Sequence, residues 1–303
     1  MPIPLFTVFT PTFNRSELLV RTYESLCRQT YRNMEWLIVD DGSSDDTAER
    51  VHAWQRSALF PIRYFHQPNG GKHRAHNVAI AHASGELLAV LDSDDTLVPL
   101  AIERLVFHWK SIPEAEQDRF SGVTCLCTDE RGELVGQAFP APVLDCRHYE
   151  LETVFRVSGE KWGCHRTSVL RQYEFPEIPG ETHCPEGLVW NRIAKRYLVR
   201  HVNEPLRVYH RHGHGLIANL AQVLSHSPQG TRRYYQECLR LDAPWRWRLR
   251  CAANYMRYSL HAGVALGDAL AESPSPVWTV LAAPAALACY TRDLVTRREA
   301  SAS

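Results

Sequence analysis

The first 112 residues alternate between short apolar runs and segments of helical periodicity, and this alternation constrains the fold more than any other feature. Strands separated by helices of about ten to fifteen residues favour βαβ units and a parallel sheet. The runs Leu37–Val39 and Leu87–Leu91 are apolar throughout, which suits strands covered on both faces. We predict strands at Leu5–Thr10, Met34–Asp40, Ile62–His66 and Leu87–Leu91, and helices at Arg15–Gln29, Asp46–Arg56, His73–Ala83 and Pro99–Ser111.

The pattern beyond residue 120 is less regular. We predict strands at Phe120–Thr128, Leu134–Ala138 and Arg200–Val208, and a helix at Leu188–Arg196. From about residue 222, Arg, Ala, Leu and Trp dominate and no strand is predicted. The expected architecture is an α/β domain over residues 1–221, with halves 1–112 and 113–221, followed by a helical C-terminal region over 222–303. Asn14 is the expected N-cap of the first helix, because Glu17 follows at capping-box spacing.

Composition excludes several classes of protein. The formal net charge of the 303 residues is zero, so nothing predicts a general attraction to nucleic acid. The nine cysteines include no Cys-x-x-Cys pair, which is typical of reduced thiols in a cytosolic protein. The N-terminus lacks the basic start of a secretory signal. The apolar stretch Val277–Tyr290 is too short for an ordinary membrane span.

Polar residues follow each of the first four predicted strands. The four segments are Thr10–Arg15, Asp40–Asp45, Gln67–His73 and Asp92–Asp95. Ligands of open α/β sheets bind beyond the carboxyl ends of the strands. We therefore expect these loops to lie along one rim that holds several carboxylates and Lys72.

Two of those carboxylates have the spacing of a metal site. Asp92 and Asp94 lie two residues apart after a buried strand, and they can ligate Mg²⁺ or Mn²⁺ while leaving positions for phosphate oxygens. Asp40 and Asp41 would accept hydrogen bonds from a base or a ribose. A calcium loop is excluded, because Leu97 replaces its glycine and a strand precedes it. The sequence also lacks a P-loop and a dinucleotide-binding glycine motif.

Five segments in order resemble family 2 glycosyltransferases with the GT-A fold. The match is close over residues 4–112 and loose to about residue 220. The resemblance implies an inverting transfer from a nucleotide sugar, usually a UDP-sugar, with Mn²⁺ or Mg²⁺. The segments are Val8–Arg15, Gln29–Tyr31, Glu35–Ser43, Asn69–Lys72 with Ala75 and Asn77, and Gly85–Asp95.

The family's functional positions map onto this sequence one by one. Asp94 would be the principal metal ligand, Asp92 would lie near the ribose or the metal, and Lys72 would lie near the ribose or phosphates. One of the histidines in Tyr209–Gly215 would complete the metal's coordination, with His212 and His214 as the candidates; the alternative is that these histidines are solvated in a loop. The expected nucleotide-sugar residues are Thr10, Pro11, Phe13, Arg15, Asp40, Asp41, Gly70, Gly71, Lys72, Asn77, Asp92 and Ser93.

An inverting transfer needs a base on the acceptor side. In the family this base is an acidic residue, often in a Glu-Asp pair, at the start of a helix in the second half of the domain. Glu186 is the candidate here, with Glu181 in reserve, and Gly187 stands where the family often has aspartate. The alternative is that Glu186 only caps a helix. Trp162 would stack on an acceptor sugar or lie in the core.

The C-terminal region is rich in arginine. Seven arginines lie between Thr231 and Arg257, and Trp245–Arg250 interleaves them with tryptophan. This pattern fits either a peripheral contact with the inner face of the cytoplasmic membrane or a solvated helical lid. The acceptor would be a glycan or a lipid-linked saccharide of bacterial surface polysaccharide synthesis. Two other functions stay open, a nucleotidyltransferase and a non-catalytic nucleotide-sugar-binding protein.

Overall fold

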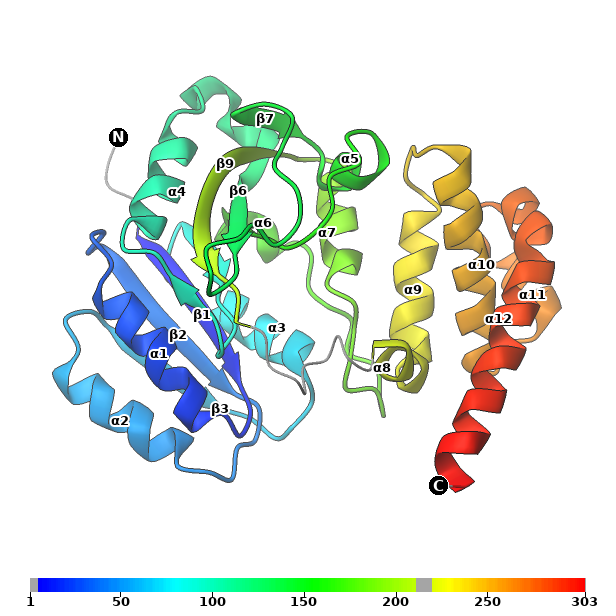
Figure 1. Ribbon diagram of the computed structural model, residues 1–303, viewed down its shortest axis with the longest axis horizontal. Helices are drawn as coiled ribbons and strands as arrows, with labels where there is room; N and C mark the ends of the chain where they lie inside the picture. The colour runs from blue at the N-terminus through cyan, green and yellow to red at the C-terminus, as the bar shows by residue number, and fades with distance from the viewer. Residues whose placement is uncertain (1–4, 211–219, 303) are drawn as a thin grey trace. The chain divides into compact units, whose positions relative to one another are not determined.

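The computed structural model describes residues 5–210 and 220–302, and the chain divides into two compact units (Figure 1). Unit 1 comprises Met1–Phe175 and Ile193–Gly213. Unit 2 comprises Pro176–Arg192 and His214–Ser303. Unit 1 contains the sheet and unit 2 is helical, so the predicted α/β fold is confirmed.

Unit 1 is built on one mixed sheet in the order β3-β2-β1-β4-β8-β6-β9-β5, with β7 paired to β9. The first four strands of that order are parallel to one another, whereas β8 is antiparallel to both β4 and β6. The carboxyl ends of β1 to β4 therefore meet at one edge. The strands are β1 Phe6–Thr12, β2 Met34–Asp40, β3 Ile62–His66, β4 Leu87–Val90, β5 Thr96–Leu97, β6 Phe120–Thr128, β7 Val143–Cys146, β8 Lys161–Arg166 and β9 Leu198–Val208.

Helices cover both faces of the parallel half, as the apolar strands require. On one face Trp36 of β2 stacks with Tyr23 of α1 and Trp54 of α2. On the other face Phe9 of β1 lies edge-on to His76 of α3. Every residue of β2 is buried. The helices of unit 1 are α1 Ser16–Cys27, α2 Thr47–Ser57, α3 Lys72–His82, α4 Ala101–Lys110, the 3-10 helix Glu114–Arg119, α5 His148–Thr153 and α6 Thr167–Leu170.

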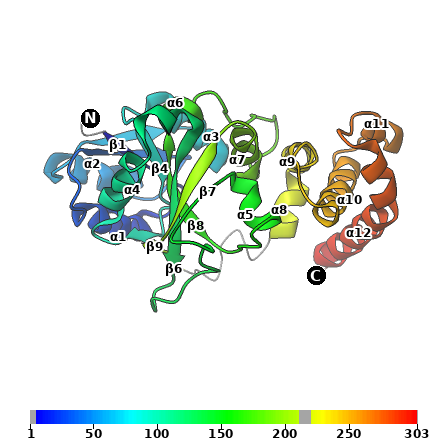
Figure 2. The same ribbon diagram turned by 90° about the horizontal axis from the view of Figure 1, so that it is seen from above.

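In unit 2, α10 packs between α9 and α12, as both views show (Figures 1 and 2). Its core includes Cys238 of α9, the α10 residues Cys251 and Tyr255, and Ala282 of α12. Within the described part of the chain, no helix is long and apolar enough to cross a membrane. The helices of unit 2 are α8 Leu220–His226, α9 Pro228–Cys238, α10 Trp245–His261, α11 Leu266–Ala271 and α12 Pro276–Ala302, and α7 Gly187–Ala194 crosses from unit 2 into unit 1 after Arg192.

The boundary between the units differs from the predicted division at residue 222. Pro176–Arg192 groups with the C-terminal helices rather than with the sheet. Polar contacts with α9 account for this grouping. Asn191 donates a hydrogen bond to the Cys238 sulfur at 3.3 Å, and Arg192 lies 3.5 Å from the Glu237 carboxylate. Sequence periodicity does not reveal such contacts.

Two local predictions are wrong. The predicted strand Leu134–Ala138 forms only two isolated bridges, at Leu134 and Gly136. Asn14 does not cap α1, because its backbone is in the left-handed region at φ 51° and its side-chain oxygen Oδ1 accepts from the Ser44 amide. The Ser16 amide at the start of α1 donates instead to Asp45, a residue of the loop after β2.

Candidate active site

Polar contacts connect the loops at the carboxyl ends of the four parallel strands. The Asn14 amide after β1 donates to the Ser43 hydroxyl after β2 at 2.8 Å. Arg15 pairs with Asp94 after β4 at 3.0 Å, and the first residue of α3, Lys72, pairs with Asp92 at 2.6 Å. The predicted rim of carboxylates and basic side chains is therefore confirmed as an arrangement in space.

Asp92 and Asp94 are the partly exposed carboxylates of this rim. Their side chains are 33% and 18% exposed, respectively. Asp92 pairs with Lys72 and Asp94 pairs with Arg15, and both of these basic side chains are also partly exposed. Burial alone would raise the pKa of Asp92, but Lys72, Arg207 and Arg15 hold it below its ordinary value. Asp92 is therefore ionised at neutral pH and able to ligate a cation.

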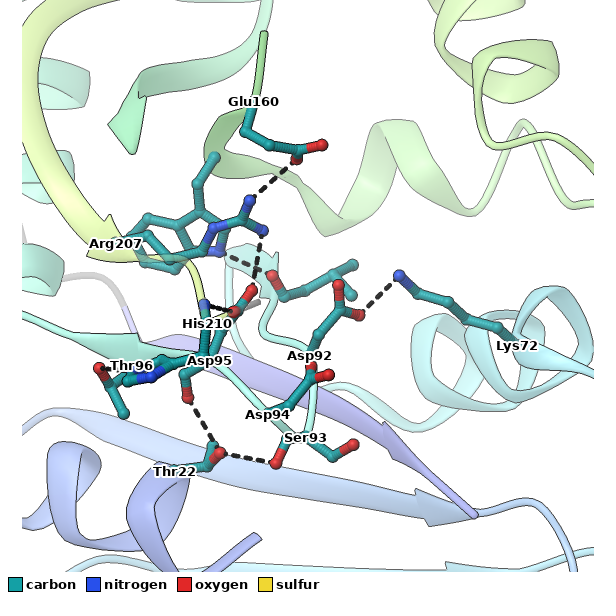
Figure 3. A network of polar contacts seen from close by, with 12 residues as sticks. Thr22, Lys72, Asp92, Ser93, Asp94, Asp95, Thr96, Glu160, Arg207 and His210 are labelled. Carbon is teal, nitrogen blue, oxygen red and sulfur yellow. Dashed lines mark hydrogen bonds and ion pairs between the residues drawn. The ribbon is translucent and has the colours of Figure 1, made fainter. Parts of the chain in front are cut away.

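Behind them lies a third carboxylate, Asp95, which is 1% exposed (Figure 3). The guanidinium of Arg207, on β9, lies 3.4 Å from it and also pairs with Glu160 at 3.0 Å. Burial raises the pKa of Asp95 to about 7, against the opposing charge of Arg207. Asp95 thus points away from solvent and links the turn after β4 to the far part of the sheet.

Two further groups hold this turn from the protein side. The Thr22 hydroxyl of α1 lies 3.1 Å from the Ser93 carbonyl and 2.9 Å from the Asp95 carbonyl (Figure 3). The His210 amide donates to Asp95 at 3.0 Å. Side chains locked in this way preserve the geometry that a binding site needs. Asp95 and Arg207 received no role from the sequence, because β9 contains several other polar residues and its pattern does not single out Arg207.

Asp40 and Asp41 contact the protein through both carboxylate oxygens. Asp40 accepts from the Ser43 amide and the Tyr64 hydroxyl, and it is 1% exposed. Asp41 accepts from Gln67 and from the amides of Gly70 and Gly71, at 2.6 to 2.9 Å. In this structure Asp40 and Asp41 therefore hold the loops around the rim in place. Contact with a base or ribose would have to use their remaining acceptor capacity.

The Asp41 contacts place the start of α3 beside β2. Gly71 precedes Lys72 with φ +96°, a conformation that a side chain would strain, so glycine is required there. The turn directs Lys72 toward Asp92 (Figure 3). Together, the helix N-terminus and Lys72 form a positively polarised edge of the kind that binds phosphate.

Three predicted contact residues have structural roles instead. Thr10 is fully buried and accepts from the Trp36 indole. Trp162 is 3% exposed, and its indole donates to the Val90 carbonyl at 2.7 Å, so its ring is not available to stack on a sugar. Asn77 clasps the backbone of Phe175 with both ends of its amide, at 2.9 Å each. The prediction that these three residues contact a ligand is therefore wrong, since their side chains bind other parts of the protein.

The other predicted donor-site residues differ in exposure. Phe13 is 45% exposed, which is high for an apolar side chain, and Pro11 is partly exposed beside it. Ser93 is only 2% exposed. Of the three, Phe13 and Pro11 offer surface to a ligand, whereas Ser93 serves mainly through its carbonyl bond to Thr22.

A divalent cation fits the donor set of this rim. Magnesium and manganese sites that also bind phosphates use one or two carboxylates and leave the remaining positions to phosphate oxygens and water. Asp92 and Asp94 supply such a pair. Within residues 5–210 and 220–302, no cluster of three or more His, Cys, Asp or Glu is placed to hold a metal. His212 and His214, the predicted additional ligands, lie outside the described residues.

The two candidate bases lie in unit 2 and differ sharply. Glu181 is 7% exposed, and its two oxygens accept from the Gln229 and Gly230 amides at the start of α9, at 2.7 and 2.8 Å. Glu181 therefore caps α9, and the prediction that it could serve as a second candidate base is wrong. Glu186 is exposed, and its carbonyl accepts from the first turn of α7. Of the two residues, Glu186 is the exposed one.

Gly187 has a steric reason to be glycine. A Cβ atom at this position would lie 2.7 Å from a ring carbon of Tyr234, a residue of α9. Aspartate, common in the family at this point, therefore cannot fit unless Tyr234 moves. The absence of the second acidic residue follows from packing within unit 2.

Replacing Gly187 with aspartate is expected to destabilise the protein by about 1–3 kcal/mol, the usual cost of overpacking. The change is measured as a lower melting temperature. Combination with Tyr234→Ala, compared with Tyr234→Ala alone, should remove most of the additional loss. Gly267→Ala is the control, since no atom lies within 4 Å of its added Cβ. Equal stability of wild type and Gly187→Asp would refute the steric explanation.

With the geometry described, the chain can be compared with known proteins. Residues 7–122 match the Glycosyl transferase family 2 model. The matched residues contain β2 to β4, all of β1 except Phe6, and the whole carboxylate rim. The match ends in β6, before the segments that carry Glu186 and Arg207.

Curated relatives extend the similarity to different lengths. "Glycosyltransferase GlyG" of Streptococcus pneumoniae is 36% identical over 115 residues, which is 38% of this chain and 37% of that protein. A "GalNAc(5)-diNAcBac-PP-undecaprenol beta-1,3-glucosyltransferase" of Campylobacter jejuni is 27% identical over 217 residues, or 68% of this chain and 65% of that protein. The chain spans only 16% of an uncharacterized glycosyltransferase of Rickettsia felis that it matches.

Solved structures support the fold beyond the family 2 region. TarS of S. aureus superposes with a TM-score of 0.63 at 18% identity, covering 90% of this chain and 50% of TarS. The mannosyltransferase PcManGT from Pyrobaculum calidifontis, solved with GDP-Man and Mn²⁺, gives 0.55 at 22% identity, covering 96% and 82%. At these identities the likeness establishes the fold and not the substrate.

Proposed function

We propose that the chain is an inverting, metal-dependent glycosyltransferase that moves a sugar from a nucleotide sugar, with UDP as the expected nucleotide, to a carbohydrate acceptor. The observation that carries this proposal is the pairing of Asp92 with Lys72 and of Asp94 with Arg15 at one edge of the sheet. Glycosyltransferases named among the relatives, and the donor complexes of TarS and PcManGT, support the same class.

The rim suits a diphosphate group. Lys72 and Arg15 now neutralise Asp92 and Asp94, and both basic side chains are about one third exposed. When a diphosphate and a divalent cation bind together, Lys72 and Arg15 can turn to phosphate oxygens while the carboxylates hold the cation. The bound cation would act as a Lewis acid that stabilises the departing nucleoside diphosphate.

The nucleoside would lie along the loops after β1 and β2. Phe13 and Pro11 supply apolar surface there, and Asp40 and Asp41 keep the surrounding loops in place. Preorganised loops of this kind reduce the ordering cost of binding. Ser93 contributes through the fixed backbone of its turn.

Glu186 is the proposed general base. Its carboxylate would take the proton of the acceptor hydroxyl as that oxygen bonds to the anomeric carbon of the sugar. The bond from that carbon to the phosphate oxygen breaks in the same step, so the configuration inverts. The support is its exposed position at the start of α7 and the resemblance to the family at that point.

A panel of nucleotide sugars tests the class of function. Thermal shifts are measured with UDP- and GDP-sugars, in Mn²⁺ and in chelator. We expect a UDP-sugar to raise the melting temperature with Mn²⁺, and to release UDP slowly when an acceptor glycoside or water takes the sugar. A response to nucleoside triphosphates with pyrophosphate release would instead indicate a nucleotidyltransferase. Binding without any sugar transfer would indicate a nucleotide-sugar-binding protein.

A further inference from the structure

One side of α12 exposes large apolar side chains. Val277, Val280, Leu281, Leu287, Leu294 and Val295 are 70%, 57%, 61%, 40%, 36% and 55% exposed, respectively. Their spacings of three, four and seven residues place them on one side of a helix. We call these six residues the α12 outer face. It extends over most of the described length of the helix.

The opposite side of α12 packs on the rest of unit 2 with small residues. Thr279, Ala282 and Ala286 are 0%, 1% and 0% exposed. Ala282 lies in the cluster formed with α9 and α10, and Ala286 contacts the cluster of Met256. Trp278 also packs against the cluster of Ala282, and Tyr290 packs against His261, whereas the large aliphatic side chains of the α12 outer face are exposed. A continuous exposed apolar face marks an interaction site.

The charges of this region are predominantly positive. Pro276–Thr291 contains no charged residue, and Arg292, Arg297 and Arg298 follow along α12. Residues 222–303 contain ten arginines and no lysine against six acidic residues. Four of these acids, Glu237, Asp242, Glu272 and Asp293, already pair with an arginine of unit 2. The segment Pro176–Arg192 adds one arginine and three glutamates, so unit 2 as a whole contains eleven arginines against nine acidic residues and keeps a net positive charge.

We propose that the α12 outer face lies on an anionic phospholipid surface. An apolar helix face enters the boundary between headgroups and acyl chains, and positive charge beside it attracts anionic lipid. A second copy of the chain fits less well, because pairing two such faces would bring two positively charged regions together. This inference does not depend on glycosyl transfer, since it rests on unit 2 alone.

Vesicle sedimentation tests the proposal with the full chain and no donor. Wild-type protein should bind phosphatidylglycerol-containing vesicles at low salt, bind pure phosphatidylcholine vesicles weakly, and dissociate as salt rises. Val280→Glu/Leu281→Glu should reduce binding by at least about tenfold, because both side chains leave the apolar phase. Leu59→Glu, at a residue of unit 1 that is 83% exposed, should bind as wild type does.

The variants are informative because the substituted side chains are already exposed, so the fold should tolerate them. Unchanged melting temperatures establish this point. Absence of vesicle binding by the wild type, or equal binding by the α12 variant, would overturn the proposal. So would a wild-type dimer in light scattering that Val280→Glu/Leu281→Glu converts to a monomer, because a second copy would then cover the face.

Discussion

Replacing Asp94 with alanine is expected to lower metal-dependent donor turnover by at least about 10²–10³-fold, the usual cost of losing one group that stabilises transition-state charge. The wild-type side chain is 18% exposed and pairs with Arg15. Its removal would take away one of the two carboxylates proposed to hold the cation, and would leave Arg15 without its carboxylate partner. The measurement is UDP release from the donor that the panel identifies, at saturating Mn²⁺.

The Asp94 result needs two controls. Asp118→Ala removes an aspartate of the same unit whose side chain is 99% exposed, and it should leave turnover unchanged. Asp94→Asn keeps the shape of the side chain but not its charge, so it should lose nearly as much activity as the alanine variant. If Asp94→Ala retained wild-type turnover with an unchanged melting temperature, the assignment of the metal and donor site would fail.

Replacing Glu186 with glutamine is expected to cut sugar transfer by about 10²–10⁴-fold and to leave donor affinity unchanged. An amide cannot accept the acceptor's proton, although it fills the same volume. Transfer of labelled sugar to an acceptor glycoside gives the rate, and titration with UDP gives the affinity.

The matched control is Glu177→Gln, which changes another exposed glutamate of the segment Pro176–Arg192. It should transfer sugar at the wild-type rate. A near-normal rate for Glu186→Gln would remove Glu186 from the proposed mechanism. Glu181 would not be the alternative base, because its carboxylate caps α9. Another residue would have to serve as the base.

The parallel half of the fold was predictable because its periodicity is local. β2 and β4 have apolar centres, and polar residues follow each strand from β1 to β4. The edge at which those polar residues meet follows from parallel topology alone. The sequence predicted that Lys72 and Asp92 lie on the same edge of the sheet, although it did not predict their ion pair.

The remaining features depend on contacts between distant segments. From the sequence, Trp162 is equally compatible with stacking on a sugar and with packing in the core. The pairing of β8 with β4 places it in the core, where its indole donates to the Val90 carbonyl. Asp95 becomes a buried link because Arg207 arrives on β9, more than a hundred residues later. A side chain at Gly187 would meet the ring of Tyr234, a residue more than forty positions later. Each outcome depends on packing, which the pattern of one segment does not contain.

The most direct test of the central claim is a calorimetric titration of UDP into the wild-type protein, in Mn²⁺ and again in excess chelator. The carboxylate rim of Asp92 and Asp94 predicts measurable binding with Mn²⁺ and an affinity at least about tenfold weaker without it, because these carboxylates would hold the cation and the cation would offset the charge of the diphosphate. Equal affinity under the two conditions would contradict a metal-bridged donor site. Absence of UDP binding under both would contradict a UDP-sugar donor.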